Sequence, residues 1–279
     1  MSQLALSLQA NVSARHLSCM ETGRAQPSRE MVLQLAQALE MRLRDRNAFL
    51  QAAGFAPTYG ETPMAAPSMS PVRDALALLL QATEPNPTFV LNRRADVVDM
   101  NATGRWLVET FNEDPAAFAP TYNFGKLLAS PKGDRAYIEN WAEVARLALS
   151  RLKSDLGGLH VRDAEDVELL AMISATLTEL GDAPATEAQA LVIPVLFRRG
   201  ELALNLFSTV TTVGRARDVT IEELRMEMFF PADEASKRVL EARRPAVGLG
   251  LGGPRPSVPA AVARSGTVAL PTGRSRRRP

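Results

Sequence analysis

Four prolines within fifteen residues divide this chain into two parts. They stand in the segment PTYGETPMAAPSMSP, at Pro57, Pro63, Pro67 and Pro71. Proline has no amide hydrogen to donate and its ring clashes with the preceding helical turn, so no helix can cross this spacing. The sequence therefore predicts a linker at 56–69, with one domain at 1–55 and a second at 70–244.

Length and composition agree with two folded domains in a soluble chain. The chain has 279 residues and a hydrophobic fraction of 46%, which is typical of proteins with a buried core. No apolar run reaches the ~20 residues of a membrane helix, and the N-terminus lacks the features of a secretion signal. The single cysteine, Cys19, cannot form an internal disulfide. We expect a cytoplasmic protein without a membrane partner.

Charge is distributed unevenly along the chain. Residues 1–60 carry six arginines against four acidic residues, residues 61–244 have an acidic excess, and residues 245–279 contain six arginines and no acid. The last segment is rich in Gly, Pro and Ala, so we expect a disordered basic tail that binds polyanions without sequence preference. Its GLGLGG has the spacing of a dinucleotide site, but prolines follow where a helix should begin, which argues against that site.

The first domain begins with two short helices joined by a tight turn. Ser2 can cap the first helix, whose predicted buried side chains are Leu4, Ala5 and Leu8. Ser13 can cap the second helix, predicted at 14–22, by accepting a hydrogen bond from the His16 amide, and Gly23 suits the left-handed position after it. Two helices with such a turn form a helix-turn-helix unit.

Two further helices complete a small all-α domain. The third is capped by Ser28, and its predicted buried stripe consists of Val32, Leu35, Ala36 and Leu39. The fourth lies in RDRNAFLQAAG and is closed by Gly54.

The segment SQLALSLQANVSARHLSCMETGRAQPSREMVLQLAQAL, residues 2–39, resembles the repressor-type helix-turn-helix of the XRE family. The turn Glu21-Thr-Gly-Arg24 and the helix start at Pro27-Ser28 are part of the likeness. The stretch VSARHLSCMETGRAQPSREMV is similar to the branch of that family whose second domain is called MmyB-like.

The resemblance implies that the helix at 14–22 is a recognition helix in the major groove of double-stranded DNA. Arg15 would be the main reader, because a guanidinium can pair bidentately with guanine O6 and N7. Shorter-range contacts would come from Ala14, His16, Ser18 and Cys19. Phosphates would be held by Gln3, Ser13, Arg24 and Arg29. A homodimer is implied, since one such unit reads only a half-site. By itself, a capped polar helix is more often a solvated surface.

The family's fold has one more helix before these, so the resemblance also implies that the first helix is missing here. Part of the wall around Leu4, Leu8, Leu17 and Leu35 would then be absent and the N-terminal domain loosened. Two functions therefore stay open. One is a DNA-binding regulator tuned by a ligand, and the other is a ligand-binding or interaction protein that has lost DNA binding.

The second domain is predicted as α+β, with helices packed on an antiparallel sheet. Its first helix, in SPVRDALALLLQA, has Ser70 as N-cap, Pro71 in its first turn, and an expected buried stripe of Val72, Ala75, Leu76, Leu79 and Leu80. The segment TFVLNRRADVVDMN predicts two strands around a turn at Arg93 and Arg94, both expected to be solvated. Asn101 can cap the next helix, and further helices are predicted at 124–130, 137–156 and 163–180.

A second strand pair, in ALVIPVLFRRGELALNLFSTVTTV, is predicted to turn at Arg199 and Gly200. The segment DVTIEELRMEMFFPADEA combines a capping box at Thr220 and Glu223 with an alternating pattern of apolar residues. We expect one helical turn followed by a strand.

This region also resembles the MmyB-like domain, through NRRADVVDMNA, NWAEVARLALSRL and STVTTVGRARDVTIEELRMEMFFPADEA. The resemblance implies a PAS-like fold that senses a small apolar molecule. From the residues themselves, a pocket between sheet and helices could be lined by Phe89, Trp106, Trp141, Leu206 and Phe229. For each of these side chains taken singly, an ordinary place in the core is the alternative.

Residues suited to catalysis are few in this sequence. The chain has two histidines and one cysteine, and His16 and Cys19 provide only two of the four ligands that zinc normally requires. The carboxylates of DAEDVELL are typical of a helix N-terminus. We expect no enzyme activity, no cofactor and no metal.

Overall fold

The computed structural model describes residues 1–159, 163–181 and 193–244. The described residues belong to one compact unit. The predicted basic tail, with its glycine-rich segment, lies outside them.

Four short helices form the N-terminal part, as the sequence predicts. They are α1 (Gln3–Gln9), α2 (Ala14–Glu21), α3 (Arg29–Ala38) and α4 (Leu43–Ala52). The hydroxyls of Ser2, Ser13 and Ser28 accept hydrogen bonds from amides three residues later, at 3.1–3.2 Å, so each predicted cap is confirmed. Gly23 and Gly54 have φ values of 71° and 83°, the left-handed conformation in which glycine ends a helix without strain.

The buried face of α1 differs from the prediction. Leu4 and Leu8 are 63% and 75% exposed, whereas Ser7 and Ala10 are buried. Residues 6, 7 and 10 lie on one side of the helix, and that side faces Leu17 and Leu35 in the small core. Helical periodicity allows either face to be buried when both carry apolar residues. Ala5 and, on α3, Leu39 are likewise exposed instead of buried.

The second part contains a five-stranded antiparallel sheet. Its strands are β1 (Thr88–Leu91), β2 (Val97–Met100), β3 (Val195–Arg199), β4 (Leu202–Thr212) and β5 (Arg225–Pro231). They are ordered β2-β1-β5-β4-β3, so the last strand pairs between the two predicted hairpins. The turns of those hairpins contain Ala95 and Gly200, which both have positive φ. The predicted α+β class is confirmed.

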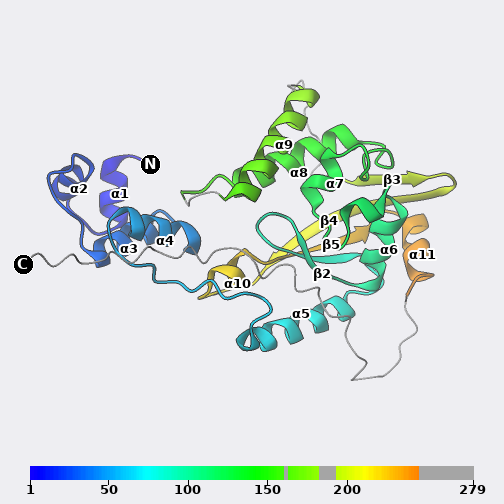
Figure 1. The fold of residues 1–279 in the computed structure, drawn as a ribbon, viewed down its shortest axis with the longest axis horizontal. Helices are drawn as coiled ribbons and strands as arrows, with labels where there is room; N and C mark the ends of the chain where they lie inside the picture. Colours follow the sequence, from blue (N-terminus) through cyan, green and yellow to red (C-terminus); the bar gives the residue numbers. More distant parts are fainter. Residues whose placement is uncertain (160–162, 182–192, 245–279) are drawn as a thin grey trace, which may run out of the picture. The chain divides into compact units, whose positions relative to one another are not determined.

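Helices cover both faces of the sheet, as Figure 1 shows. Helix α5 (Ser70–Ala82) packs on one face, where Leu76 and Leu80 contact Val90 and Met226. The other face is covered by α6 (Ala102–Thr110), α7 (Phe124–Ala129), α8 (Trp141–Asp155) and α9 (Ala164–Leu180), and α11 (Glu234–Glu241) packs on β4 and β5. Shorter elements are α10 (Val219–Glu223) and the 3₁₀ turns η1 (Pro67–Met69) and η2 (Pro115–Phe118).

Three local predictions in this part are wrong in detail. Ala75 and Leu79 are exposed, because only the stripe of Leu76 and Leu80 reaches the sheet. Ser70 is the first residue of α5 and not its cap, because the 3₁₀ turn η1 runs directly into the helix. The cap of α10 is Asp218, whose carboxylate accepts from the Thr220 amide at 2.9 Å, and not Thr220.

The segment predicted as a linker is hydrogen-bonded to the start of α10. The Val219 amide donates to the Gly60 carbonyl at 2.8 Å, and Asp218 Oδ2 accepts from the amide and hydroxyl of Thr62 at 3.1 and 2.7 Å. These bonds hold the segment against the residues that precede β5.

Candidate functional site

A cavity of about 230 Å³ lies between the sheet and helices α6 to α8. Apolar side chains form most of its wall, including Phe89, Leu107, Leu127, Leu149 and Phe229. The sheet residues among them share one face, because side chains alternate between faces along a strand. The cavity therefore lies inside the main core of the second part.

Aromatic rings shape this wall. The ring of Phe89 packs edge-on against Phe229 at 5.9 Å and against Phe124 at 4.9 Å between centroids. The rings of Phe111 and Phe197 lie 5.0 Å apart. Such contacts hold the rings in place and so give the apolar wall a fixed shape.

Of the five residues predicted to line a pocket, Phe89 and Phe229 line this cavity and three do not. Leu206 is fully buried in the adjoining core. The indole of Trp141 donates to the Leu128 carbonyl at 2.9 Å and lies under the Arg135 guanidinium. Trp106 lies under Arg243, 3.9 Å from ring centroid to guanidinium carbon. Both tryptophans thus serve at the edge of the core.

Charged groups enter the cavity wall in two polar places. The first is formed by Asn112 and Asp134, near the N-terminal side of α8. Burial raises the pKa of Asp134 to about 7, although a hydrogen bond from its own amide opposes the shift. The adjacent Gly133 lies so close to the Leu127 carbonyl that a Cβ there would be 1.9 Å from that oxygen. Glycine at this position therefore allows the chain to bring Asp134 to the cavity.

The second polar place lies at the C-terminal end of α8, where Arg151, Asp155, Arg225 and Glu227 line the cavity. Burial raises the pKa of Glu227, against the effect of a hydrogen bond with Ser208. Burial alone would also raise the pKa of Asp155, but hydrogen bonds from Arg225 and Arg42 outweigh it and hold that pKa below its usual value. Asp155 is therefore a carboxylate held between two guanidinium groups.

Arg42 belongs to the N-terminal part, directly before α4. Its Nη2 donates to Asp155 Oδ1 at 2.7 Å, while Asp155 Oδ2 binds Arg225. Nearby, the Leu43 amide donates to Glu222 Oε2 at 2.7 Å, and Asp45 Oδ1 accepts from the Leu159 amide at 2.7 Å. The beginning of α4 is thus hydrogen-bonded to residues around the second polar place.

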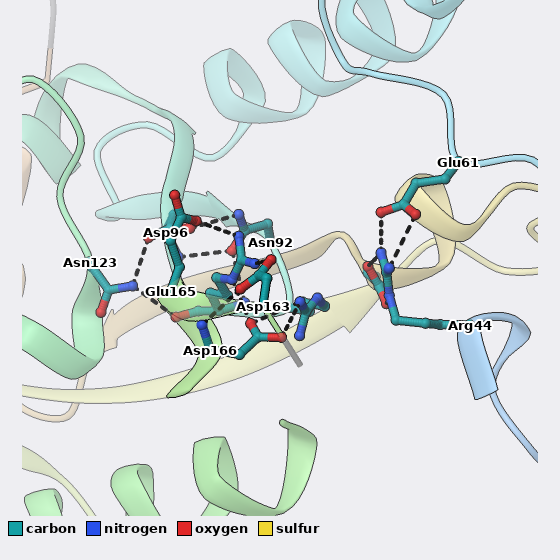
Figure 2. A network of polar contacts seen from close by, with 11 residues as sticks. Arg44, Glu61, Asn92, Asp96, Asn123, Asp163, Glu165 and Asp166 are labelled. Carbon is teal, nitrogen blue, oxygen red and sulfur yellow. Dashed lines mark hydrogen bonds and ion pairs between the residues drawn. The ribbon is translucent and has the colours of Figure 1, made fainter. Parts of the chain in front are cut away.

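Arg44 adds to this contact. Its guanidinium binds Glu223 on α10, with 2.6 Å from Nε to Oε1. It also binds Glu61, as Figure 2 shows. Burial would lower the pKa of Arg44, but hydrogen bonds to the two carboxylates raise it far above its usual value. Arg44 therefore stays charged and connects α4, the proline-rich segment and α10.

The turn between β1 and β2 carries a second ion-pair network, and it corrects the prediction for Arg93 and Arg94. Both arginines bind Asp166, which is fully buried in the first turn of α9, at 2.6–2.8 Å. Arg94 also binds Asp163 and Glu165 (Figure 2). The turn residues were expected in solvent because their partners lie about 70 positions later in the chain. The opposite charges of the arginines in NRRAD and the carboxylates in DAEDVE are the sequence feature that could have indicated this contact.

Asp96 joins the same turn to α7. It accepts hydrogen bonds from Asn92 at 2.9 Å and from Asn123 at 2.7 Å, and Asn123 also caps α7 through the Lys126 amide at 2.9 Å (Figure 2). Since Asn92 lines the cavity, these bonds fix one of its edges.

The residues predicted to contact DNA lie on and around α2. Arg15, Ser13, Arg24, Arg29 and Gln3 are exposed, and Ala14, His16, Ser18 and Cys19 are half-buried. Gln3 donates to Glu21 at 2.6 Å, and Arg29 donates to Thr58 at 2.8 Å. Within the described ranges, the guanidinium groups of Arg15 and Arg24 have no hydrogen bond or ion pair to another residue, so they are available.

Two further observations limit the kind of site. Among the residues that the structure describes, no three His, Cys, Asp or Glu side chains are grouped to hold a metal ion. Within those same ranges, no helix combines the length and apolar character needed to cross a membrane.

Comparison with known families agrees with the second part of the chain. The model of the family described as MmyB-like transcription regulator ligand binding domain matches residues 72–242, from α5 to the end of α11. The match does not extend to the four N-terminal helices, and no curated protein matches the chain. The family is one of transcription regulators and not of enzymes. By this match over more than half of its length, the chain belongs to the MmyB-like transcription regulator ligand-binding domain family.

Proposed function

We propose that the protein is a sequence-specific DNA-binding transcriptional regulator whose affinity for DNA is adjusted by a small apolar ligand in the cavity. The family of residues 72–242 supports regulation and ligand sensing. The helix-turn-helix pattern of α1 and α2, with caps at Ser2 and Ser13, supports DNA binding by residues 1–55. In this proposal 56–69 is the linker and 70–244 the sensor.

The observation that carries the proposal is that Asp155 belongs both to the cavity wall and to a contact with the N-terminal part. This carboxylate lines the cavity and accepts a hydrogen bond from Arg42 beside α4. A ligand that displaces Asp155 or Arg225 therefore changes a contact of the DNA-binding part. The ligand can shift DNA affinity only as far as its own affinity differs between the two arrangements.

DNA recognition is assigned to the exposed side of α2. Arg15 reads guanine in the major groove, with Ala14, His16, Ser18 and Cys19 close to the bases, and phosphates are held by Gln3, Ser13, Arg24 and Arg29. The protein acts as a homodimer, because two copies of α2 are needed for the two half-sites of a palindromic operator.

Selection of genomic DNA fragments by the purified full chain tests this proposal. We expect enrichment of one motif with two related half-sites at physiological salt. Native mass spectrometry of the same preparation tests whether an apolar molecule is bound. Titrating a selected fragment with delipidated and with untreated protein then tests whether the bound molecule changes the affinity for DNA.

A second function remains a candidate because the family match covers the sensor and not α1 to α4. The protein would then bind a ligand and a protein partner without binding DNA. A bound apolar molecule together with no enriched DNA motif favours this second function. An enriched motif excludes it.

A further inference from the structure

Two side-chain oxygens stand at the first polar place of the cavity. Two backbone hydrogen bonds join the segment after α6 to the segment after α7. The Glu113 amide donates to the Gly133 carbonyl at 3.1 Å, and the Asp114 amide donates to the Lys132 carbonyl at 3.0 Å. The first of these bonds joins the residues next to Asn112 and Asp134, and both Asn112 and Asp134 line the cavity. We call Asn112 Oδ1 and Asp134 Oδ1 the acceptor pair.

The orientation of the Asn112 amide is fixed. Its Nδ2 donates to the Val108 carbonyl at 2.9 Å, so the other amide atom, Oδ1, must be the acceptor. The residue is only 2% exposed, and within the described residues Oδ1 has no hydrogen-bond partner. Buried acceptors in folded proteins almost always have a partner, so an unpaired one calls for an explanation.

Asp134 presents the same feature with a titratable group. Its Oδ1 is enclosed and has no partner among the described residues. The nearby cations are engaged elsewhere, since Arg135 binds Glu179 and Lys132 lies 3.8 Å from Asp114. Two unpaired acceptors at one place in an apolar wall favour a ligand that donates hydrogen bonds.

The charges at the second polar place do not favour an anionic ligand. Arg225 is already paired with Asp155. Arg151 and Glu227 also line the cavity there, and the charge of Arg151 acts on Glu227 by lowering the pKa of that carboxyl group. The lining thus contains three carboxyl groups and two guanidinium groups. A carboxylate head group would add to the acidic excess and would bring oxygen against oxygen at the acceptor pair.

We propose that the ligand is an apolar amine whose protonated nitrogen donates hydrogen bonds to the acceptor pair. The hydrocarbon part packs against Phe111, Leu128 and Phe197, which line the same region. An ammonium group has three donors, so it can serve both oxygens, and the carboxylate of Asp134 balances its charge. The inference rests on the proposed ligand site and specifies the chemistry of its ligand.

Calorimetric titration of the delipidated full chain at pH 7.4 with octylamine, octanol and octanoate tests the inference. The three probes share a chain length and differ only in the head group. We expect octylamine to bind about tenfold more tightly than octanol, because its hydrogen bonds are charge-assisted, and octanoate to bind more weakly than octanol.

Asp134→Asn should weaken octylamine binding about tenfold and leave octanol within about twofold, since it removes the charge and retains an oxygen acceptor. Asn112→Leu, which removes the other acceptor at similar size, provides a second variant and should also weaken octylamine. Asp99→Asn makes the same chemical change at an exposed position of β2 and should alter neither affinity.

Octanoate binding as tightly as octylamine, unchanged octylamine binding in both variants, or no binding of any probe would overturn the inference. These results are distinct from failure of the proposed function. If octylamine binds as expected and the affinity for a selected DNA fragment does not change, the inference that the cavity binds an amine is supported. The proposal that a ligand adjusts DNA affinity is then wrong.

Discussion

Arg42 Nη2 lies 2.7 Å from Asp155 Oδ1, and so a residue next to helix α4 donates a hydrogen bond to a carboxylate that lines the internal cavity. Asp155 has a second partner in Arg225, the first residue of β5. The carboxylate is 9% exposed and the Arg42 side chain 48% exposed. Asp155 therefore connects the cavity wall with the residue that directly precedes α4.

Arg42→Ala should reduce the effect of a cavity ligand on DNA affinity and leave ligand affinity within about twofold. Because Arg42 is half exposed, the pair itself stabilises the fold by only ~0–1 kcal/mol. DNA binding measured by fluorescence anisotropy, with and without ligand, gives the coupling as a ratio. Arg105→Ala, at an exposed position of α6, is the matched control and should keep the full ratio. An undiminished ratio in Arg42→Ala would show that this ion pair does not transmit the effect.

Gly133→Ala should lower the free energy of unfolding by about 1–3 kcal/mol, the usual cost of forcing an atom into a packed site. The added Cβ would lie 1.9 Å from the Leu127 carbonyl oxygen, so the backbone must move. Gly214→Ala is the control, since nothing lies within 4 Å of its Cβ position. Urea denaturation of both variants makes the comparison, and equal stabilities would contradict the close approach at Gly133.

Asp166→Ala should cost about 3–5 kcal/mol of unfolding free energy, because it removes a buried carboxylate that binds both Arg93 and Arg94. Burial alone would raise the pKa of Asp166, but hydrogen bonds from Arg93 and Arg94 lower it. The stability from this carboxylate is thus present at neutral pH and lost as the pH falls through the folded-state pKa. Glu165→Ala removes an exposed partner of Arg94 and should cost ~0–1 kcal/mol. Thermal denaturation of the two variants should separate them clearly.

Local features of the fold could be predicted from the sequence. The caps at Ser13 and Asn101 depend on residues within three positions. The Ser13 hydroxyl and the Asn101 amide oxygen each accept the expected hydrogen bond from the backbone amide three residues later. The hairpin turn at Gly200 likewise depends on one residue with positive φ. In these cases the interacting groups are neighbours in the chain, so a short pattern contains all the information needed.

Features that depend on distant residues could not be predicted in this way. Arg93 is buried because Asp166, 73 positions later, supplies its partner. Leu79 is exposed because the sheet covers a narrower stripe of α5 than the apolar pattern suggests. Asn112 and Asp134 carry no motif at all, and only the pairing of their segments brings both to one cavity. Residue type and spacing do not specify contacts between residues that lie far apart in the chain.

Asp134→Asn should remove a pH dependence of stability. The folded-state pKa of about 7 lies above the ordinary value of 3.8, so between these two values the unfolded chain loses its proton while the folded protein keeps it. The free energy of unfolding of the wild type therefore falls as the pH rises through this window, with a slope on the order of 1.4 kcal/mol per pH unit. Over the whole window the loss is roughly a few kcal/mol. Below about pH 4 the group contributes nothing.

Urea denaturation of both proteins at pH 5 and pH 8 gives the test. The variant should gain stability relative to the wild type between the two pH values, and the effects of all other groups cancel in this difference. A stability difference that is the same at both pH values would mean that Asp134 ionises normally in the folded protein.

Arg15→Ala should weaken binding to a selected DNA fragment by roughly 1–3 kcal/mol, the discrimination that one bidentate arginine–guanine pair provides. Arg15 is the second residue of α2, it is exposed, and within the described residues it has no partner that the substitution would leave unpaired. The unfolding free energy should therefore stay within about 0.5 kcal/mol of the wild type. Arg24→Ala, at a proposed phosphate contact, should instead weaken binding to all sequences similarly and reduce its salt dependence. Gel-shift titrations against the selected fragment and a scrambled one distinguish the two arginines. Equal loss on both fragments for Arg15→Ala would assign Arg15 to the phosphates, and no loss on either would remove α2 from the DNA interface.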